Sequence, residues 1–582
     1  MRGHRGGLRA RVGTCAAAVW LGLLPQLPVH AVHRQAAAPS AHEPRSTLLT
    51  GATYIGPVAP HTMLSLILTL HDPNAARKDK DLTAMYKPGS RSYGHYLSAS
   101  EVASRYGPAP AAIDRLRSLL ATLRLSIDWH RGNDWLAVSG EAGSIQKAFR
   151  ATANWYVSPR GTRFYASAGE PTLPEVLQPY VTAVGPLTNY FEPQSHVVPA
   201  GGLAPDDLLG AYDIAPLREL GLDGTGQTVV FFESDGFAQS DLDTFTAKFG
   251  LPRIQPVIRA GPTLAAGAET EMDLEIVHEI APGAKLLLYN IDSKAAATKA
   301  QTVPNFLQVL LDLQQQMVND NPGAVLSQSW GICETPFGQA IADAHKNLYD
   351  HADALGESVF VSTGDNAAYE CLRISPRGTV PSKDNLAVPL PAAVPGVTAT
   401  GGTRLSVSAN KGWYNETVWE EPISTNGTGG GVTRYFTRPA WQQGSGVEDA
   451  QYNPKRMRSI PDVSADGDPV SGASIYITDG HGGGQWSAGG GTSQSAPIWA
   501  GIAALFNQYL QQKGLHAAGF MNPALYQIAA HPSPYQAFHD VTMGSNLYYP
   551  ATPGYDMASG LGTPDAWNLA RDLEAYQRGS VQ

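Results

Sequence analysis

Residues 359–365 read Val-Phe-Val-Ser-Thr-Gly-Asp, a short apolar run that ends at polar residues and a glycine. Three similar runs precede it, at residues 228–232, 285–289 and 324–327. Helical patterns separate the runs, and this alternation predicts parallel strands in a doubly wound α/β sheet. In such sheets, functional side chains collect at the carboxyl ends of the strands. We therefore expect Asp365 to lie near a functional site, with a plain turn residue after Gly364 as the alternative.

The length of the chain, 582 residues, exceeds what one hydrophobic core normally serves, so at least two domains are expected. Residues 48–190 combine predicted strands at 63–70 and 135–138 with a predicted helix at 111–123. This mixture indicates a smaller α+β domain, which we take as ferredoxin-like. A linker is expected at residues 191–205, and the larger α/β domain at 206–582.

The N-terminus has the pattern of a secretory signal. Four arginines precede an apolar stretch from residue 12 to about 27, followed by the small-residue exit Val29-His30-Ala31. A membrane anchor is the alternative, but Pro25 and Pro28 interrupt a stretch already shorter than the roughly 20 apolar residues of a span. We predict a signal peptide at 1–31, a spacer at 32–47, and a secreted protein.

Charge and cysteine content narrow the function further. The net charge is −10 and no basic run follows the first residues, which argues against nucleic acid or an anionic membrane as partner. Export leaves two cysteines, Cys333 and Cys371, and an oxidising compartment favours one disulfide between them. Two buried free thiols are the alternative.

A candidate nucleophile lies in a glycine-rich stretch at residues 489–497, which reads Gly-Gly-Gly-Thr-Ser-Gln-Ser-Ala-Pro and leads into a helical apolar pattern. Ser493 is predicted at the start of that helix, where free N–H groups favour negative charge. Pro497 is expected in the first turn, where its missing N–H costs little. Ser493 or Thr492 could instead be a plain helix cap. A nucleophilic serine also requires a base.

The sequence around the histidines argues against a histidine as the base. Ser493 sits in a Gly-Thr-Ser-x-x-x-Pro motif typical of subtilisin-like folds, but no His-Gly-Thr segment accompanies it. An acidic helix is predicted at residues 269–280 instead, stopped by Pro-Gly. Glu269 and Asp273 share one face of it, and Glu271 and Glu275 form an equally good pair. Spacing alone does not choose between them, or exclude a solvated acidic helix.

Three motifs together resemble the sedolisins, the family of serine-carboxyl peptidases. They are residues 269–284 with Glu-x-x-Met-Asp-Leu-Glu and Ala-Pro-Gly-Ala, residues 362–365 (Ser-Thr-Gly-Asp), and residues 491–497 (Gly-Thr-Ser-x-x-x-Pro). Their order and spacing match the family over nearly the whole chain after the signal. The resemblance implies a subtilisin-like catalytic domain, and it selects Glu269 and Asp273 as the carboxylate pair.

The resemblance also implies the roles of the site residues. Ser493 would attack the peptide carbonyl, Glu269 would accept its proton, and Asp273 would orient Glu269. Asp365 would lie in the oxyanion hole, where a protonated carboxyl can donate a hydrogen bond. Glu233 and Trp330 would extend the hydrogen-bond chain of the carboxylates or be plain packing. A carboxylate base suits acidic media, where histidine is mostly protonated.

Residues 48–190 would then be an activation prodomain that inhibits the enzyme until it is removed, through cleavage between about residues 192 and 205. The expected substrates are polypeptides, and the protein is expected to be a monomer. An endopeptidase is predicted. The alternatives are a tripeptidyl-peptidase, a catalytically silent binding protein of the same fold, and a neutral subtilisin-like protease.

The same resemblance implies one structural Ca²⁺ ion near the C-terminus. Sedolisins bind calcium between an Asp-Ile/Val dipeptide and a Gly-Pro-Gly-x-Asp loop, through oxygen ligands of the kind that Ca²⁺ prefers. This chain has Thr552 where that loop usually begins with glycine. The implied ligands are Asp540, Val541, Thr552, Gly554 and Asp556.

Overall fold

The computed structural model describes residues 49, 51–159, 161–190, 198–199, 202–292, 306–372, 380–478, 483–531 and 535–580. The predicted signal peptide and spacer lie outside these ranges, as does most of the predicted linker. No helix within them is long and apolar enough to cross a membrane. Residues 45–582 form one compact unit.

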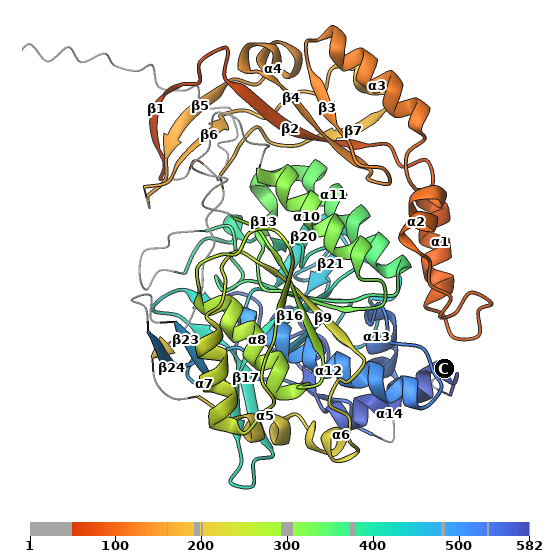
Figure 1. Ribbon diagram of the computed structural model, residues 1–582, viewed down its shortest axis with the longest axis vertical. Helices are drawn as coiled ribbons and strands as arrows, with labels where there is room; N and C mark the ends of the chain where they lie inside the picture. Colours follow the sequence, from red (N-terminus) through yellow and green to blue (C-terminus); the bar gives the residue numbers. More distant parts are fainter. Residues whose placement is uncertain are drawn as a thin grey trace, which may run out of the picture. The chain divides into compact units, whose positions relative to one another are not determined.

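The predicted runs form neighbouring strands of an eight-stranded sheet (Figure 1). Its order is β10-β11-β9-β12-β14-β16-β17, with β22 also paired to β16. All pairs are parallel except β16 with β17. The bounds are β9 Thr228–Glu233, β10 Val257–Ala260, β11 Lys285–Asn290, β12 Val325–Gln328, β14 Ser358–Ser362, β16 Thr398–Val407, β17 Trp413–Val418 and β22 Val463–Asp466.

Helices cover both faces of this sheet, as the side chains of β9 show. Val229 and Phe231 belong to one buried cluster, with residues of α8 (Ala268–Ile280) and α12 (Thr492–Gln512). Val230 and Phe232 point the other way, into a second cluster with residues of α10 (Phe306–Asp320) and α11 (Glu334–Ala354). Alternation between two apolar faces is what a sheet buried on both sides requires. The predicted doubly wound α/β fold is confirmed.

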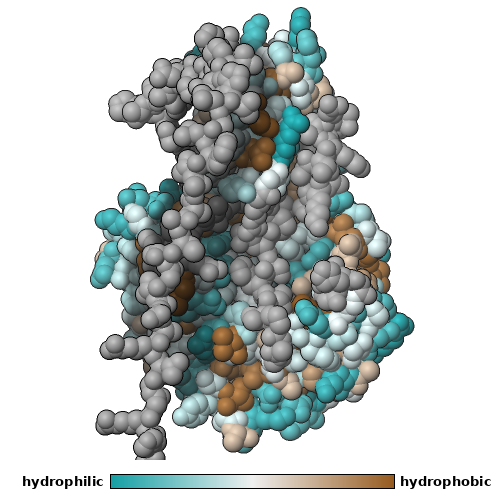
Figure 2. Space-filling view, turned by 90° about the vertical axis from the view of Figure 1, so that its left-hand side faces the viewer, coloured by the Kyte–Doolittle hydropathy of each residue, from teal (hydrophilic) through white to brown (hydrophobic). Residues whose placement is uncertain are grey.

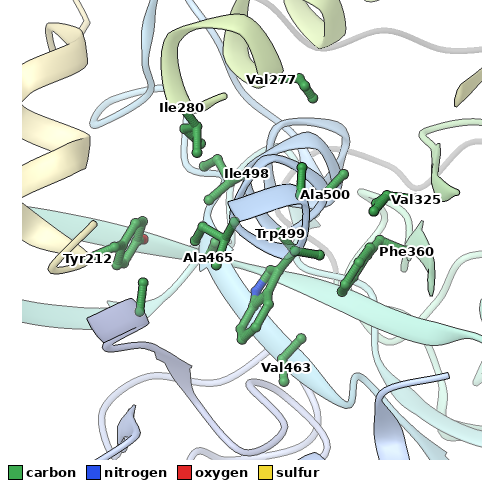
Figure 3. Close-up of a cluster of buried hydrophobic side chains, with 14 of the residues drawn as sticks. Tyr212, Val277, Ile280, Val325, Phe360, Val463, Ala465, Ile498, Trp499 and Ala500 are labelled. Atoms are coloured by element: carbon green, nitrogen blue, oxygen red, sulfur yellow. The ribbon is translucent and has the colours of Figure 1, made fainter. Parts of the chain in front are cut away.

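Helix α12 passes through the centre of the first cluster. Its residues from Thr492 to Leu510 are all buried. Trp499 stacks on Phe360 of β14, with ring centroids 6.2 Å apart, and donates its indole N–H to the carbonyl of Ser464 at 2.9 Å (Figure 3). A helix that is apolar all round is held by core packing on every side. The start of α12 is therefore fixed relative to the strand ends.

Shorter elements complete the larger domain. The helices are α5 Pro205–Ala211, α6 Ala215–Glu219, α7 Gln239–Phe249, α13 Asn522–Ala530 and α14 Ala566–Gln577. The strands are β8 Val198–Pro199, β13 Ile332–Cys333, β15 Pro389–Leu390, β18 Glu420–Glu421, β19 Asn426–Gly427, β20 Gly431–Thr437, β21 Met457–Ile460, β23 Ser474–Thr478, β24 Gly484–Ala488, β25 Phe538–His539 and β26 Thr563–Pro564.

The smaller domain has the α+β composition that the sequence predicts. Its four-stranded antiparallel sheet has the order β3-β4-β2-β7. Taken with α3 and α4, this order is that of the ferredoxin-like fold. The bounds are β2 Met63–Leu70, α3 Pro110–Thr122, β3 Ser126–Asp128, β4 Trp135–Glu141, α4 Ala142–Phe149 and β7 Val181–Val184. A second sheet contains β1 Thr53–Pro57, β5 Ala153–Val157 and β6 Arg163–Ser167, and the remaining helices are α1 Ala75–Met85 and α2 Ala99–Arg105.

The segment between α1 and α2 binds the larger domain through tyrosines. The Tyr86 hydroxyl donates to the carbonyl of Asp353 at 2.5 Å, and the Tyr86 carbonyl accepts from the Tyr576 hydroxyl at 3.0 Å. Phe520 meets the Tyr86 ring edge to face, with centroids 5.8 Å apart. Tyr86 and Phe520 also belong to the hydrophobic cluster around α10 and α11, and Tyr96 packs against it. The two domains therefore share part of one core.

The described surface mixes polar and apolar residues. On the face shown in Figure 2, hydrophobic residues gather in separate patches among hydrophilic ones. Exposed single apolar side chains such as Ile423 and Val470 belong to this pattern. Patches of this kind are normal on soluble proteins and need no partner to explain them.

A buried lysine joins the two domains electrostatically. Lys78 of α1 is 1% exposed, and its Nζ lies 3.1 Å from Asp72, 3.7 Å from Asp134 and 3.2 Å from Asp350 of α11. Burial lowers the pKa of Lys78, but the three carboxylates outweigh burial, so the pKa lies above its ordinary value. Burial likewise raises the pKa of Asp350, but Lys346 and Lys78 outweigh it and hold that pKa below its ordinary value.

We predict that Lys78→Met destabilises the whole chain at pH 7.5 by about 3–5 kcal/mol, because it leaves several carboxylates buried without their cation. The Asp350 contribution is present above its unfolded-state pKa and is lost as pH falls through its lowered folded pKa. Asp134, whose pKa burial raises to about 7, accepts a proton on acidification and relieves the repulsion. The deficit should therefore be smaller at pH 4.5.

Urea unfolding at both pH values measures this difference, in a chain that also carries Ser493→Ala to prevent the predicted self-cleavage. Lys80→Met is the matched control, since Lys80 lies on the same helix and is exposed. Equal losses for the two variants, or a deficit that grows in acid, would contradict the prediction.

Candidate active site

Ser493 is the second residue of α12, next to the carboxyl ends of the central strands. The helix follows Gly491, whose φ of +83° favours glycine. The predicted place of Pro497 is wrong, however, because Pro497 is the sixth residue of α12 and lies beyond the first turn. In an α-helix, the N–H of residue 497 would donate to the carbonyl four residues earlier, which is that of Ser493. Proline has no N–H, so this hydrogen bond is absent. That carbonyl is instead contacted by the hydroxyl of Ser329, at 3.2 Å.

Thr492 ties the start of α12 to Asp365. The backbone N–H of Thr492 donates to Oδ1 of Asp365 at 2.7 Å, and its hydroxyl lies 2.9 Å from the same oxygen. The Thr492 Oγ1 accepts from the N–H of Gly364 at 2.9 Å. Asp365 thus lies beside Ser493, as its position after β14 predicts. Sequence reasoning gave Thr492 no role beyond a cap, although it directly precedes the candidate nucleophile.

Helix α8 carries the candidate carboxylates, and its first turn is fixed to the end of β9. Asp235, two residues beyond β9, accepts hydrogen bonds from the N–H and hydroxyl of Thr270, at 3.1 and 2.6 Å. Every residue of α8 from Glu269 to Ile280 is buried. The alternative of a solvated acidic helix is therefore excluded.

The structure separates the two carboxylate pairs that spacing could not distinguish. Glu271 accepts from the N–H groups of Ala238 and Thr478, at 2.8 and 2.6 Å, and Glu275 accepts from that of Tyr476 at 2.8 Å. Both residues of this pair hold backbone of the α7 and β23 segments. Of the other pair, Glu269 and Asp273, Asp273 contacts Ser329 in the loop after β12.

Asp273 reaches the backbone of Ser493 through one side chain. Ser329 Oγ, in the loop after β12, lies 2.8 and 3.1 Å from the two carboxylate oxygens of Asp273, and also contacts the Ser493 carbonyl. Ser329 was missed at the sequence level. Its signal was available, because it follows β12 as Asp365 follows the neighbouring strand β14.

Four carboxyl groups influence one another here. Burial raises the pKa of Asp273 well above its ordinary value, and the charges of Glu233 and Glu269 raise it further. Burial also raises the pKa of Glu233, as do the charges of Asp235 and Glu269. Since neighbouring carboxylates do not all ionise cheaply in a dry site, the group retains protons at pH values where isolated carboxyls have lost them.

The predicted partners Glu233 and Trp330 are in contact. The indole N–H of Trp330 donates to Oε2 of Glu233 at 2.8 Å, and both side chains are buried. This contact belongs to the carboxyl group cluster and is more than incidental packing.

Histidine has no comparable position among the described residues. His278 contacts the carbonyl of Pro252 through Nε2 at 2.7 Å, and burial lowers its pKa to about 4. His481 lies outside the described residues. The predicted disulfide between Cys333 and Cys371 is present, and it joins the segment after β12 to the segment after β14.

The predicted calcium ligands come together from two loops. Asp540 Oδ2 accepts from the N–H of Gly554 at 2.9 Å, and Asp556 Oδ2 accepts from that of Thr552 at 2.9 Å. The hydroxyl of Ser559 lies 3.3 Å from the carbonyl of Val541 and about as close to Asp556. No group of three or more His, Cys, Asp or Glu side chains suited to a metal occurs in the described part of the chain. An ion here would need backbone carbonyls as well as the two carboxylates.

Comparisons with known proteins agree with this arrangement. The activation domain of pro-kumamolisin matches residues 50–190, and the subtilase family matches residues 260–527. Kumamolisin from Bacillus sp. (strain MN-32) is 29% identical over 515 residues, which cover 82% of this chain and 86% of kumamolisin. Sedolisin from Pseudomonas sp. (strain 101) is 28% identical over 554 residues, 88% of this chain and 87% of sedolisin.

Tripeptidyl-peptidase 1 from Canis lupus familiaris is 26% identical over 586 residues, which cover 90% of this chain and 94% of that protein. Among solved structures, Pseudomonas sedolisin complexed with two molecules of pseudo-iodotyrostatin aligns with a TM-score of 0.54 at 28% identity. The alignment covers 65% of this chain and 99% of that one.

The chain is a serine-type peptidase with an activation domain in front of it. This follows from the parallel sheet of subtilisin type, the serine at the start of a buried helix and these similarities. Within that class, the chain is similar over most of its length to kumamolisin and sedolisin, and it carries an activation domain like that of pro-kumamolisin.

We predict that Gly491→Ala lowers the kcat/KM of peptide hydrolysis at least about 10²-fold, because it displaces Asp365, the expected oxyanion donor. A Cβ at this position would lie 2.5 Å from Oδ2 of Asp365. Gly514→Ala is the matched control, since Gly514 has a similar φ of +70° and nothing within 4 Å of such a Cβ. Initial rates on an internally quenched peptide measure both. A large loss in both variants would assign the effect to backbone strain and contradict the prediction.

Proposed function

We propose that this chain is the precursor of a secreted, acid-active serine-carboxyl endopeptidase that hydrolyses polypeptides through an acyl-enzyme. The observation that carries the proposal is the group of buried carboxyls linked by Ser329 to the backbone of Ser493. Its sheet and activation domain are those of a sedolisin-family precursor. No described histidine contacts this group, so its acid–base chemistry falls to carboxyl groups.

In the proposed mechanism, Ser493 Oγ attacks the scissile carbonyl and forms a bond to its carbon. Glu269 accepts the hydroxyl proton and later gives it to the leaving amine, as a general base and then a general acid. Asp273 orients Glu269 and holds the second proton of the pair. The carboxyl of Asp365, fixed by Thr492, lies beside the nucleophile and would donate to the developing oxyanion if it carries its proton. Water then hydrolyses the acyl-enzyme by the same steps.

Acid activity follows from the choice of base. The buried pair keeps one proton and one charge only over the range between its two apparent pKa values. Burial and neighbouring carboxyls raise the pKa of Asp273, which extends that range upward from the pH at which isolated carboxyls ionise, and we propose that the range begins in acid. Above it, the pair loses the proton that the mechanism needs, and the rate falls.

The activation domain would keep the enzyme inactive until cleavage in the linker between about residues 192 and 205. Its contacts with α11 and α14, through Lys78 and Tyr86, would retain it on the catalytic domain before processing. We propose that acid incubation leads to self-cleavage in this linker and release of the domain.

We predict that the purified precursor, incubated at pH 4, gives a new N-terminus within the linker and hydrolyses an internally quenched peptide with an acidic optimum. Ser493→Ala should do neither, and Glu269→Gln should lose at least about 10³ in kcat. Glu279→Gln is the matched control, because Glu279 is buried on the same helix, outside the proposed machinery. N-terminal sequencing and pH–rate profiles measure these outcomes. A neutral optimum, or activity in Ser493→Ala, would refute the proposal.

A tripeptidyl substrate with a free N-terminus, assayed in parallel, distinguishes endopeptidase from tripeptidyl-peptidase action. The second activity is worth testing because relatives named tripeptidyl-peptidase 1 match nearly the whole chain. Faster turnover of that substrate than of an N-terminally blocked peptide would favour the tripeptidyl alternative.

We also propose one structural Ca²⁺ ion, held by the carboxylates of Asp540 and Asp556 and by carbonyls of Val541, Thr552 and Gly554. The two loops already lie against each other, and all of these donors are the hard oxygens that Ca²⁺ prefers. Bound calcium would cross-link the loops and take no part in the reaction.

We predict that Ca²⁺ raises the thermal midpoint of the chain by several degrees, because an ion that binds only the folded state stabilises it. Asp556→Asn should abolish this increase, whereas Asp384→Asn, on the exposed surface, should preserve it. Calorimetric titration of the metal-free protein and thermal unfolding measure the effect. No tight binding by the unchanged chain would remove the proposed site.

A further inference from the structure

Ser329 lies between the two halves of the proposed machinery. Its side chain is nearly buried, at 8% exposure, in the loop that follows β12. Its hydroxyl oxygen lies 2.8 and 3.1 Å from the carboxylate oxygens of Asp273 and 3.2 Å from the carbonyl oxygen of Ser493. The Ser329 carbonyl accepts from the hydroxyl of Ser362, at 3.0 Å, which holds the loop against the end of β14.

A hydroxyl carries only one proton to donate, and here it faces two acceptors. The Ser493 carbonyl is a genuine second acceptor because Pro497 supplies no helix N–H to it. Ser329 therefore donates either to Asp273 or to Ser493, and the protonation state of Asp273 decides which. A protonated Asp273 accepts less strongly and can donate its own proton to Ser329 Oγ or to Glu233, which leaves the Ser329 proton for Ser493.

We propose that Ser329 is a positioning residue that couples the protonation of Asp273 to the backbone of the nucleophile. With Asp273 protonated, the hydrogen bonds run from Asp273 to Ser329 and from Ser329 to the Ser493 carbonyl. With Asp273 ionised, Ser329 turns to the carboxylate and the Ser493 carbonyl loses this donor. The inference rests on the roles proposed above for Asp273 and Ser493.

The charges around Asp273 favour the protonated arrangement in acid. Glu269 faces it from the same helix and Glu233 from the end of β9, with Asp235 beyond Glu233. Trp330, from the loop that carries Ser329, contributes a neutral N–H to Glu233. The charged groups that act on Asp273 are thus carboxyls, which oppose its ionisation, and the Ser329 hydroxyl acts in the other direction.

This opposition gives Ser329→Ala a signature that a merely structural role would not produce. A hydrogen bond to an ionised carboxylate is stronger than one from a neutral carboxyl, so loss of the hydroxyl raises the pKa of Asp273. The alkaline limb of kcat/KM should move to higher pH, by about one pH unit for a charge-assisted bond. The kcat at the optimum should fall about 10-fold or more, with little change in KM, since the Ser493 carbonyl also loses its donor.

The experiment compares Ser329→Ala, Ser329→Thr and Ser329→Cys with the unchanged enzyme in full pH–rate profiles after activation. The Thr variant keeps a hydroxyl, so the alkaline limb of its kcat/KM should lie at the pH of the unchanged enzyme. The Cys variant has a weaker donor, so its alkaline limb should lie between those of the Thr and Ala variants. Ser358→Ala is the matched control, because this buried serine lies at the other end of β14 and donates to the Gly519 carbonyl at 2.7 Å. Its profile should match that of the unchanged enzyme.

A fall in kcat with both pH limbs unmoved, or equal profiles for the Ala and Thr variants, would overturn the proposal. If Ser329→Ala does not fold, the ordering of the Cys and Thr limbs still decides it. Failure of the broader mechanism is distinguishable, because Ser493→Ala would then keep its activity whatever the Ser329 variants do.

Discussion

The buried carboxyl groups between β9 and the first turns of α8 are the constraint on which the rest of the site depends. Removing several such groups from water is costly unless protons, donors or cations compensate for it. Here the compensation comes from Trp330, Ser329 and shared protons. The helix α12, fixed on every side by the core, brings Ser493, the proposed nucleophile, to this fixed group. A site built in this way retains protons at pH values where isolated carboxyls have lost them.

Buried carboxylates are also compensated at the contact between the activation domain and α11, but there by a cation. There, carboxylates of both domains surround one buried ammonium, that of Lys78. The tyrosines between α1 and α2 add neutral donors to backbone carbonyls and an aromatic core. The precursor thus combines one acidic cluster that needs protons with another that needs a cation. Acidification acts on the two clusters in opposite senses. It supplies protons to the cluster around Asp273, and it weakens the ion pairs of the carboxylates with Lys78.

Much of the fold could be predicted from the sequence, because short apolar runs separated by helical patterns have few alternatives. The four strands of the large sheet, the α+β composition of the smaller domain and the Cys333–Cys371 disulfide follow from such patterns and from residue counts. The choice of Glu269 and Asp273 could not be made from spacing, because burial on both sides of α8 leaves no polar face to identify. Ser329 and Thr492 act through contacts between segments distant in the chain, which local patterns do not report.

Pro497 affects the helical hydrogen bonding of Ser493. The interval of four residues between Ser493 and Pro497 equals the reach of one α-helical hydrogen bond. The proline therefore removes the helical hydrogen bond that would end on the carbonyl of Ser493, the proposed nucleophile. Any other residue at 497 would restore a competing N–H and satisfy that oxygen locally. Proline leaves that oxygen to the hydroxyl of Ser329 in the loop after β12, so the motif specifies an interrupted helix as well as a proposed nucleophile.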